Sequence, residues 1–168
     1  MLSAGSVALC DNANESYGST TIDQRARLAS EITRADLQKL ADEKLSDAQI
    51  LFNAKSWSNA YYLAGYAVEL AIKACIAKSF KADTIPDKGL VNDTYSHKFP
   101  RLIGTAGLSA ELQKQEQASQ DFAAAWGVVN EWSPDERYRV SSEQDAKELI
   151  EAISHATHGV LPWIRAHW

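Results

Sequence analysis

The sequence predicts an all-α protein. Apolar residues recur at steps of three and four in four separate segments, which is the period of one helix face. No segment of useful length alternates apolar and polar residues as a half-buried strand does. Short turns separate the helical segments at all but one junction, so we expect an antiparallel up-and-down bundle of four long helices plus one short helix.

Length and composition set the class of protein. A chain of 168 residues with 45% hydrophobic residues is long enough for one globular domain. The net charge of −5 argues against a protein that coats nucleic acid by charge alone. Two cysteines cannot form a disulfide framework, and no Lys or Arg precedes the short apolar run near the start, so we expect a cytoplasmic protein without a secretory signal.

The first 30 residues are rich in Ser, Asn, Asp, Thr and Gly and have no sustained period. We expect 1–30 to be a mobile leader and 31–168 to be a single helical domain. The first long helix is predicted near 33–54. Its apolar face is Leu37, Leu40, Ala41, Leu45, Ala48, Leu51 and Phe52.

The second long helix is predicted over 57–80, after the capping residues of "SWSN". A loop over 81–96 and a short helix ending at Gly107 follow. The third long helix is expected from Ser109 to about Trp132. The last helix begins at a predicted capping box of Ser141 and Gln144 and continues until Pro162 bends or ends it.

The second helix has two distinct faces when it is drawn at 100 degrees per residue. One face is a seam of small residues: Ala60, Ala64, Ala67, Ala71 and Ala74. Small side chains at this spacing let a neighbouring helix come close, so the seam is the predicted deepest face. The opposite face carries a polar aromatic stripe: Tyr62, Tyr66, Glu69 and Lys73. The two charges in this stripe also argue against a membrane-spanning segment.

Two interpretations of the polar aromatic stripe are open. In the first, the stripe faces solvent or a partner subunit, and Glu69 and Lys73 form an ordinary surface pair worth about 0.3 to 0.5 kcal/mol. In the second, the stripe lines a groove for a nucleotide or a protein partner, because aromatic faces stack on bases and Lys contacts phosphate. Residues 73–101 contain six basic and three acidic residues, a local net charge of +3. This charge would attract a phosphate-bearing ligand, although lysines near a helix C-terminus also offset its dipole.

Three motifs together resemble the HEPN family, whose name refers to a nucleotide-binding domain of higher eukaryotes and prokaryotes. They are "YYLAGYAVELAIKA", the later "HKFPRLIGTAGL", and the "RY" pair in "WSPDERYR". The resemblance covers residues 35–165. It implies a helical bundle, commonly a homodimer, that is similar to the helical domain accompanying small nucleotidyltransferases. Some members of the family are ribonuclease toxins.

The sequence departs from the pattern of the ribonuclease members, in which an Arg is followed after four to six residues by a His. The positions at that distance after Arg137 are Ser142, Glu143 and Gln144, and neither Arg101 nor Arg139 is followed by a His at that distance. The resemblance therefore implies the scaffold and a binding groove rather than catalysis. The predicted ligand-binding residues are Tyr62, Tyr66, Glu69, Lys73, His97, Arg101, Arg137 and Tyr138.

Three hypotheses of function remain open. The first is a noncatalytic module for a nucleotide, RNA or a nucleotidyltransferase partner, in a toxin–antitoxin or defence-type system. The second is a metal-independent ribonuclease in which His97 and Arg137 meet in space. The third is a purely structural dimerisation domain. No cofactor and no metal site are predicted, since His155 and His158 lie on one helix without a second ligand-bearing helix. Both residues of the proposed ribonuclease site also have a possible structural role. His97 would hydrogen-bond its own loop, and Arg137 would pair with Glu69.

Overall fold

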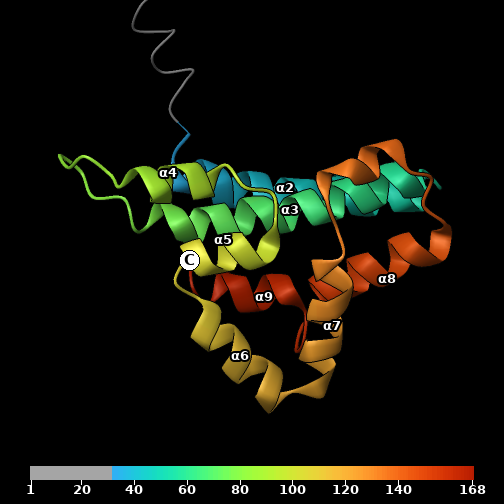
Figure 1. The fold of residues 1–168 in the computed structure, drawn as a ribbon. Helices are drawn as coiled ribbons and strands as arrows, with labels where there is room; N and C mark the ends of the chain where they lie inside the picture. Colours follow the sequence, from blue (N-terminus) through green and yellow to red (C-terminus); the bar gives the residue numbers. More distant parts are fainter. Residues whose placement is uncertain (1–31) are drawn as a thin grey trace, which may run out of the picture. The chain divides into compact units, whose positions relative to one another are not determined.

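We analysed a computed structural model of the chain, which describes residues 32–168 (Figure 1). Within it, Thr33–Trp168 form one compact unit, and every regular element of this unit is a helix. The elements are α2 (Arg34–Asn53), α3 (Trp57–Ala77), α4 (Lys88–Thr94), α5 (Phe99–Thr105), α6 (Ser109–Ala118), α7 (Gln120–Asn130), the 3-10 helix η1 (Pro134–Tyr138), α8 (Glu143–Ser154) and α9 (Val160–Arg165). The predicted all-α class is confirmed. The predicted leader lies outside the described residues.

Helices α2 and α3 form a long antiparallel hairpin, the most extensive helix pair in the unit (Figure 1). A capping box starts α2: the Thr33 side chain accepts a hydrogen bond from the backbone N–H of Asp36, whose carboxylate accepts one from the backbone N–H of Thr33. The turn after α2 contains Lys55 at a φ of 61°, in the left-handed region that reverses the chain.

Helix α3 is the centre of the fold. It contacts α2, α5, η1, α8 and α9. All five alanines of the predicted seam are completely buried, so this prediction is confirmed. Helix α3 is the one described helix whose length and composition would allow it to cross a membrane, but 67% of its apolar window is buried inside the fold. We therefore interpret α3 as a core helix.

The predicted third long helix is wrong as a single element. It is two helices, α6 and α7, that meet at Ser119. Ser119 has extended backbone angles (φ −145°, ψ 112°), and its hydroxyl accepts a hydrogen bond from the backbone N–H of Phe122 at 3.1 Å. The side chain therefore acts as the N-cap of α7, which lets the chain change direction.

The predicted last helix is also divided. Helix α8 begins one residue later than expected, at a capping box of Ser142 and Asp145 instead of Ser141 and Gln144. It ends at Ser154, well before Pro162. A tight turn follows, in which a Cβ atom on Gly159 would lie only 2.4 Å from the carbonyl oxygen of His155. Pro162 lies inside the short helix α9, in its first turn, where a missing N–H is tolerated.

The predicted loop 81–96 contains a further short helix, α4, with no buried residue. The Asp87 side chain caps it by accepting a hydrogen bond from the backbone N–H of Leu90 at 3.0 Å. Helix α5 ends as predicted, with Gly107 at a φ of 73° directly after its C-cap. Residues 32–168 therefore contain two long helices instead of the predicted four: α2 and α3 have 20 and 21 residues, and the other helices of this range are shorter.

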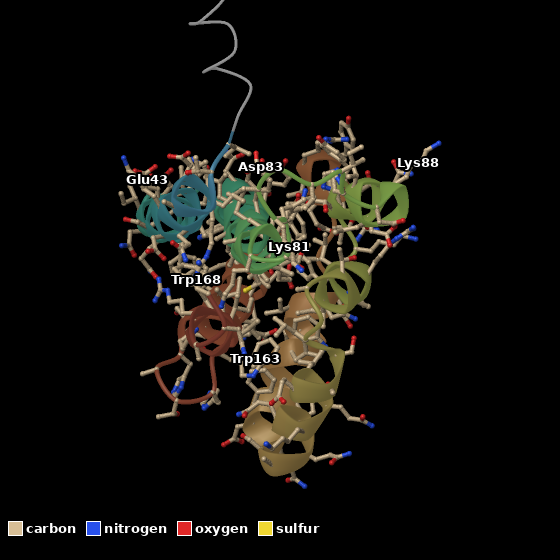
Figure 2. The ribbon with its side chains drawn as sticks, turned by 90° about the vertical axis from the view of Figure 1, so that its left-hand side faces the viewer. Glu43, Lys81, Asp83, Lys88, Trp163 and Trp168 are labelled. Carbon is tan, nitrogen blue, oxygen red and sulfur yellow. The ribbon has the colours of Figure 1, made fainter. Side chains whose placement is uncertain are left out.

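The C-terminal segment is attached to α3. The indole N–H of Trp168 donates to the carbonyl oxygen of Ala71 at 3.2 Å, and Figure 2 shows Trp168 between α9 and α3. The Lys78 ammonium donates to the carbonyl oxygens of His167 and Trp168 at 2.7 and 2.8 Å. Packing of α9 thereby closes one side of the core around α3.

Candidate functional site

Glu69 lies in the core instead of on an open surface. Its side chain is 2% exposed and that of Lys73 is 16% exposed. The interpretation in which Glu69 and Lys73 form an ordinary surface pair is therefore wrong. The polar aromatic stripe of α3 is partly covered: His97, just before α5, contacts Glu69, and Trp132, just after α7, contacts Tyr62, while Tyr62, Tyr66 and Lys73 stay partly exposed. A partly buried ion pair of this kind differs from a surface pair, because removal of either partner leaves an uncompensated charge.

An ammonium and an imidazole hold the Glu69 carboxylate. The Lys73 ammonium donates to its Oε1 at 2.9 Å, one helical turn away. The Nδ1 atom of His97 lies 2.9 Å from both carboxylate oxygens. Because an ionised carboxylate can only accept hydrogen bonds, the His97 proton lies on Nδ1. The Nε2 atom of His97, whose side chain is 56% exposed, is thereby the ring nitrogen left for other partners.

Aromatic rings form the other half of the covered stripe. Tyr62 and Tyr66 stack with ring centroids 6.2 Å apart, and Tyr62 also contacts Trp132 at 6.0 Å. Trp132 stacks on Phe99 at 5.4 Å, with only 6° between the ring planes. Tyr62 is thus engaged with two other rings, whereas Tyr66, which is partly exposed, contacts one. Burial, and next the nearby charge of Glu69, raise the pKa of Tyr66.

Gly65 determines how Trp132 packs. A Cβ atom at Gly65 would lie 2.2 to 2.4 Å from three atoms of the Trp132 indole ring. The ring therefore rests directly on the α3 backbone. Its Nε1 atom is buried and has no hydrogen-bond partner among residues 32–168, which is uncommon for a buried donor.

A cavity of about 440 Å³ opens beside this cluster. Its lining combines the start of α5 with the end of α7, and the residues are His97, Lys98, Phe99, Pro100, Arg101, Asn130, Glu131, Trp132 and Ser133. The lining therefore has three basic residues on the α5 side, and three polar residues and Trp132 on the other side. The volume is in the usual range of small-molecule sites.

The predicted site residues are divided between this region and a different surface. Glu69, Lys73 and His97 come together, and Arg101 lines the same cavity as His97. Arg137 and Tyr138 do not join them. Both are exposed in η1, where the Arg137 guanidinium lies 4.8 Å from the ring centroid of Tyr138.

The two structural alternatives given for Arg137 and His97 are wrong. Glu69 binds Lys73 and His97, and no ion pair with Arg137 is present among the described residues. His97 bonds across the fold to α3 rather than within its own loop. The buried acid of η1 is Glu136, which accepts a hydrogen bond from Arg139 at 3.1 Å.

Sequence reasoning missed Lys98, Trp132 and the polar residues at the end of α7. The signal for Lys98 was present, because it lies between His97 and Arg101 in the basic segment 73–101. The position of Trp132 depends on its contact with Gly65, 67 residues earlier, and no local pattern indicates that contact. Arg101 itself donates to the Asp93 carboxylate from Nε at 2.9 Å.

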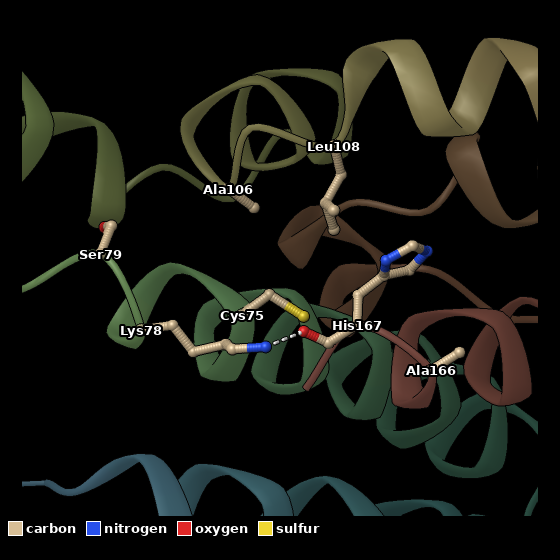
Figure 3. A pocket seen from close by; sticks show the side chains of 7 residues that line it. All are labelled: Cys75, Lys78, Ser79, Ala106, Leu108, Ala166 and His167. Carbon is tan, nitrogen blue, oxygen red and sulfur yellow. Dashed lines mark hydrogen bonds between the residues drawn. The ribbon is translucent and has the colours of Figure 1, made fainter.

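A second cavity of about 420 Å³ lies at the C-terminal end of α3, and Figure 3 shows its lining. The Lys78 ammonium reaches across it to the carbonyl oxygen of His167, near the Cys75 thiol. Burial raises the pKa of this thiol to about 11. Lys78 is the one Lys or Arg in the lining, and its ammonium already donates to backbone carbonyls, so we regard this cavity as a weaker candidate for an anionic ligand.

Fold and site define an all-helical domain built on a long α2–α3 hairpin, with a buried carboxylate on α3 that is held by a later histidine. Residues 35–87 match the model of one family, described as the HEPN domain. The resemblance predicted from the sequence is thus confirmed for this segment, which contains α3 and all of α2 except its first residue. No curated protein and no solved structure matches the chain.

Proposed function

We propose that the protein is a noncatalytic HEPN-like module that binds a nucleotide or RNA through its phosphate groups. The observation that carries this proposal is the basic wall of the 440 Å³ cavity, formed by His97, Lys98 and Arg101. The match to the HEPN domain supports the general class of nucleotide- or RNA-related modules. The local charge of +3 over residues 73–101, in a chain of net charge −5, supports an anionic ligand at this place.

The three basic groups would act differently on a phosphate. Lys98 is exposed, and its ammonium has no hydrogen bond or ion pair within the described part of the chain. Arg101 offers further donors while it is held by Asp93. His97 would contact the ligand through Nε2, because Nδ1 is bonded to Glu69. In this proposal Glu69 orients the His97 ring through its contact with Nδ1, and Lys73 holds Glu69 in place. Neither Glu69 nor Lys73 touches the ligand.

A titration tests this proposal. Binding of a fluorescent RNA oligomer and of adenosine monophosphate is measured for the wild type, Lys98→Ala and Lys39→Ala. Lys39 is a matched control, since it is an exposed lysine on α2, a helix that does not contribute to the cavity. We expect Lys98→Ala to weaken binding by about tenfold and Lys39→Ala to leave it unchanged. Absence of any binding by the wild type would overturn the proposal.

A second candidate function is a metal-independent ribonuclease, favoured by the Glu69–His97 contact. A carboxylate that holds Nδ1–H of a histidine leaves Nε2 free to accept a proton from a ribose hydroxyl. Arg101 would take the phosphate-binding role that the sequence had suggested for Arg137, since it lines the same cavity as His97. Incubation of total RNA with the wild type and with His97→Ala decides this alternative, because unchanged RNA in both samples rules it out.

The assembly is a further part of the proposal. We propose a cytoplasmic homodimer that works with a small nucleotidyltransferase, in a toxin–antitoxin or defence-type system. A purely structural dimerisation domain is the alternative without a ligand. The mass in solution tests the dimer, and a nucleotidyltransferase encoded in the adjacent reading frame would support the pairing.

A further inference from the structure

We infer that helix α4 is a detachable autoinhibitory arm, whose Asp93 carboxylate competes with an anionic ligand for the guanidinium of Arg101. This inference rests on the proposed function, because it adds a regulation of the same phosphate-binding cavity. It requires two properties of the molecule. Helix α4 must be weakly attached to the rest of the fold, and Asp93 must engage the donors of Arg101 that a phosphate would use.

Helix α4 has little attachment to the core. None of its residues is buried, and α5 is the one helix with which it has more than marginal contact. Its larger apolar residues, Leu90 and Val91, are partly buried but do not pack against the hydrophobic core of the described chain. The loop 81–87 that leads into α4 is exposed, and Figure 2 shows Lys88, the first residue of α4, at the edge of the molecule. Burial of apolar surface therefore contributes little to holding α4 in place.

A single ion pair ties α4 to α5. The Oδ1 atom of Asp93 accepts hydrogen bonds from Nε of Arg101 at 2.9 Å and from Nη2 at 2.5 Å. Among residues 32–168 this is the one hydrogen-bonded link between α4 and another helix, since the other side-chain bonds of α4 stay within the helix and its cap. The side chains of Asp93 and Arg101 are 33% and 60% exposed. Water and salt weaken a pair of this kind, so it can open readily.

The ion pair uses the donors that a phosphate would need. The Nε–H and one Nη2–H of a guanidinium point in the same direction and bind the oxygens of a carboxylate or a phosphate as a fork. Asp93 occupies this edge and offsets the charge of Arg101, which lines the cavity together with His97 and Lys98. A phosphate that binds this edge of Arg101 must displace Asp93, and α4 then loses its tie to α5.

The competition couples the cavity to the position of α4. By linkage, release of α4 strengthens anion binding by the same factor by which the anion favours release of α4. Helix α4 supplies no residue to the lining of the cavity. It therefore acts on the affinity of the cavity through Arg101 alone.

Calorimetric titration of the full chain with inorganic pyrophosphate tests the competition. Asp93→Asn should bind about fivefold more tightly than the wild type, which is about 1 kcal/mol at about 1.4 kcal/mol per tenfold and the most that an exposed ion pair contributes. In an Arg101→Gln background the same substitution should change the affinity by less than about twofold, because the competing contact is already absent. Asp83→Asn, an exposed acid in the loop before α4, controls for the general loss of a negative charge and should stay within about twofold of the wild type.

The order of α4 supplies a second measurement, which does not depend on affinity. The heteronuclear NOE of the backbone amides of Leu90–Thr94 reports their motion on the picosecond to nanosecond timescale. It should fall in the wild type when pyrophosphate is added, and it should be low in ligand-free Arg101→Gln, because in both cases Asp93 has lost its partner. In Asp93→Asn it should already be low and should not respond to the anion.

Some outcomes overturn the inference and leave the proposed function standing. Equal affinity of the wild type and Asp93→Asn for pyrophosphate removes the competition. An equal gain from Asp93→Asn with and without Arg101 assigns the effect to general electrostatics. Amides of α4 that keep their order when pyrophosphate binds show that the anion does not release the arm. Binding of an RNA oligomer without binding of pyrophosphate also contradicts the inference alone, whereas no binding of either ligand by any variant contradicts both.

Discussion

The Nδ1 atom of His97 lies 2.9 Å from both carboxylate oxygens of Glu69, across 28 residues of sequence. This contact fixes the segment before α5 to the centre of α3. The same segment supplies the basic wall of the cavity, so the position of that wall depends on a buried carboxylate. Glu69 is thus a structural residue with a direct consequence for the proposed ligand site.

Glu69→Gln is expected to destabilise the protein. The amide keeps the shape of the side chain but leaves the 16%-exposed Lys73 without a counter-charge and weakens the contact with His97. We expect the free energy of unfolding to fall by roughly 3 kcal/mol, as for a broken buried pair. Urea denaturation followed by circular dichroism measures it.

Glu43→Gln is the matched control, since Glu43 pairs with Lys39 four residues away on the exposed side of α2 (Figure 2). Its cost should stay below about 0.5 kcal/mol. Equal effects of the two substitutions would show that burial of Glu69 has no energetic consequence.

Gly65→Ala and Gly127→Ala should have opposite effects. A methyl group at Gly65 overlaps the Trp132 indole at 2.2 Å, and overpacking of a core costs about 1 to 3 kcal/mol. Gly127 lies in α7 with no atom within 4 Å of the added Cβ. Alanine there should stabilise the helix by up to about 1 kcal/mol. Thermal unfolding of both variants checks the prediction, which fails if Gly65→Ala unfolds at or above the wild-type temperature.

Cys75 should react slowly with thiol reagents in the folded protein. It is 5% exposed, and burial raises the pKa of its thiol to about 11, so little thiolate exists at pH 8. The labelling rate should rise with pH up to about 11 and should rise sharply in denaturant. The measurement uses a Cys10→Ser variant, so that Cys75 is the single thiol. Rapid labelling at pH 7 without denaturant would contradict the assigned burial.

Asp93→Asn should strengthen nucleotide binding. The Asp93 carboxylate now accepts hydrogen bonds from the Arg101 guanidinium, and both side chains are partly exposed. Without this charge, Arg101 is freer to bind a phosphate, while the loss of an exposed pair should cost under about 1 kcal/mol of stability. Asp83→Asn, an exposed acid in the loop before α4, serves as control. Weaker binding by Asp93→Asn would mean that Asp93 orients Arg101 for the ligand.

The alanine seam of α3 could be predicted because five small residues recur at helical spacing, and this periodicity does not depend on distant residues. The burial of Glu69 could not, since its partner His97 is 28 residues away. The division of the predicted third helix into α6 and α7 at Ser119 could not be predicted either. An N-cap serine and an exposed serine within a helix look alike in sequence. The cavity depends on the contact of Trp132 with Gly65, which no local pattern specifies.

The most direct test of the proposed binding site is a map of amide chemical-shift changes on addition of adenosine monophosphate to the isotope-labelled chain. We expect the largest changes at His97–Arg101 and at Asn130–Ser133, the two walls of the cavity. Changes confined to the second cavity, around Lys78 and Leu108, or no changes at all would contradict it.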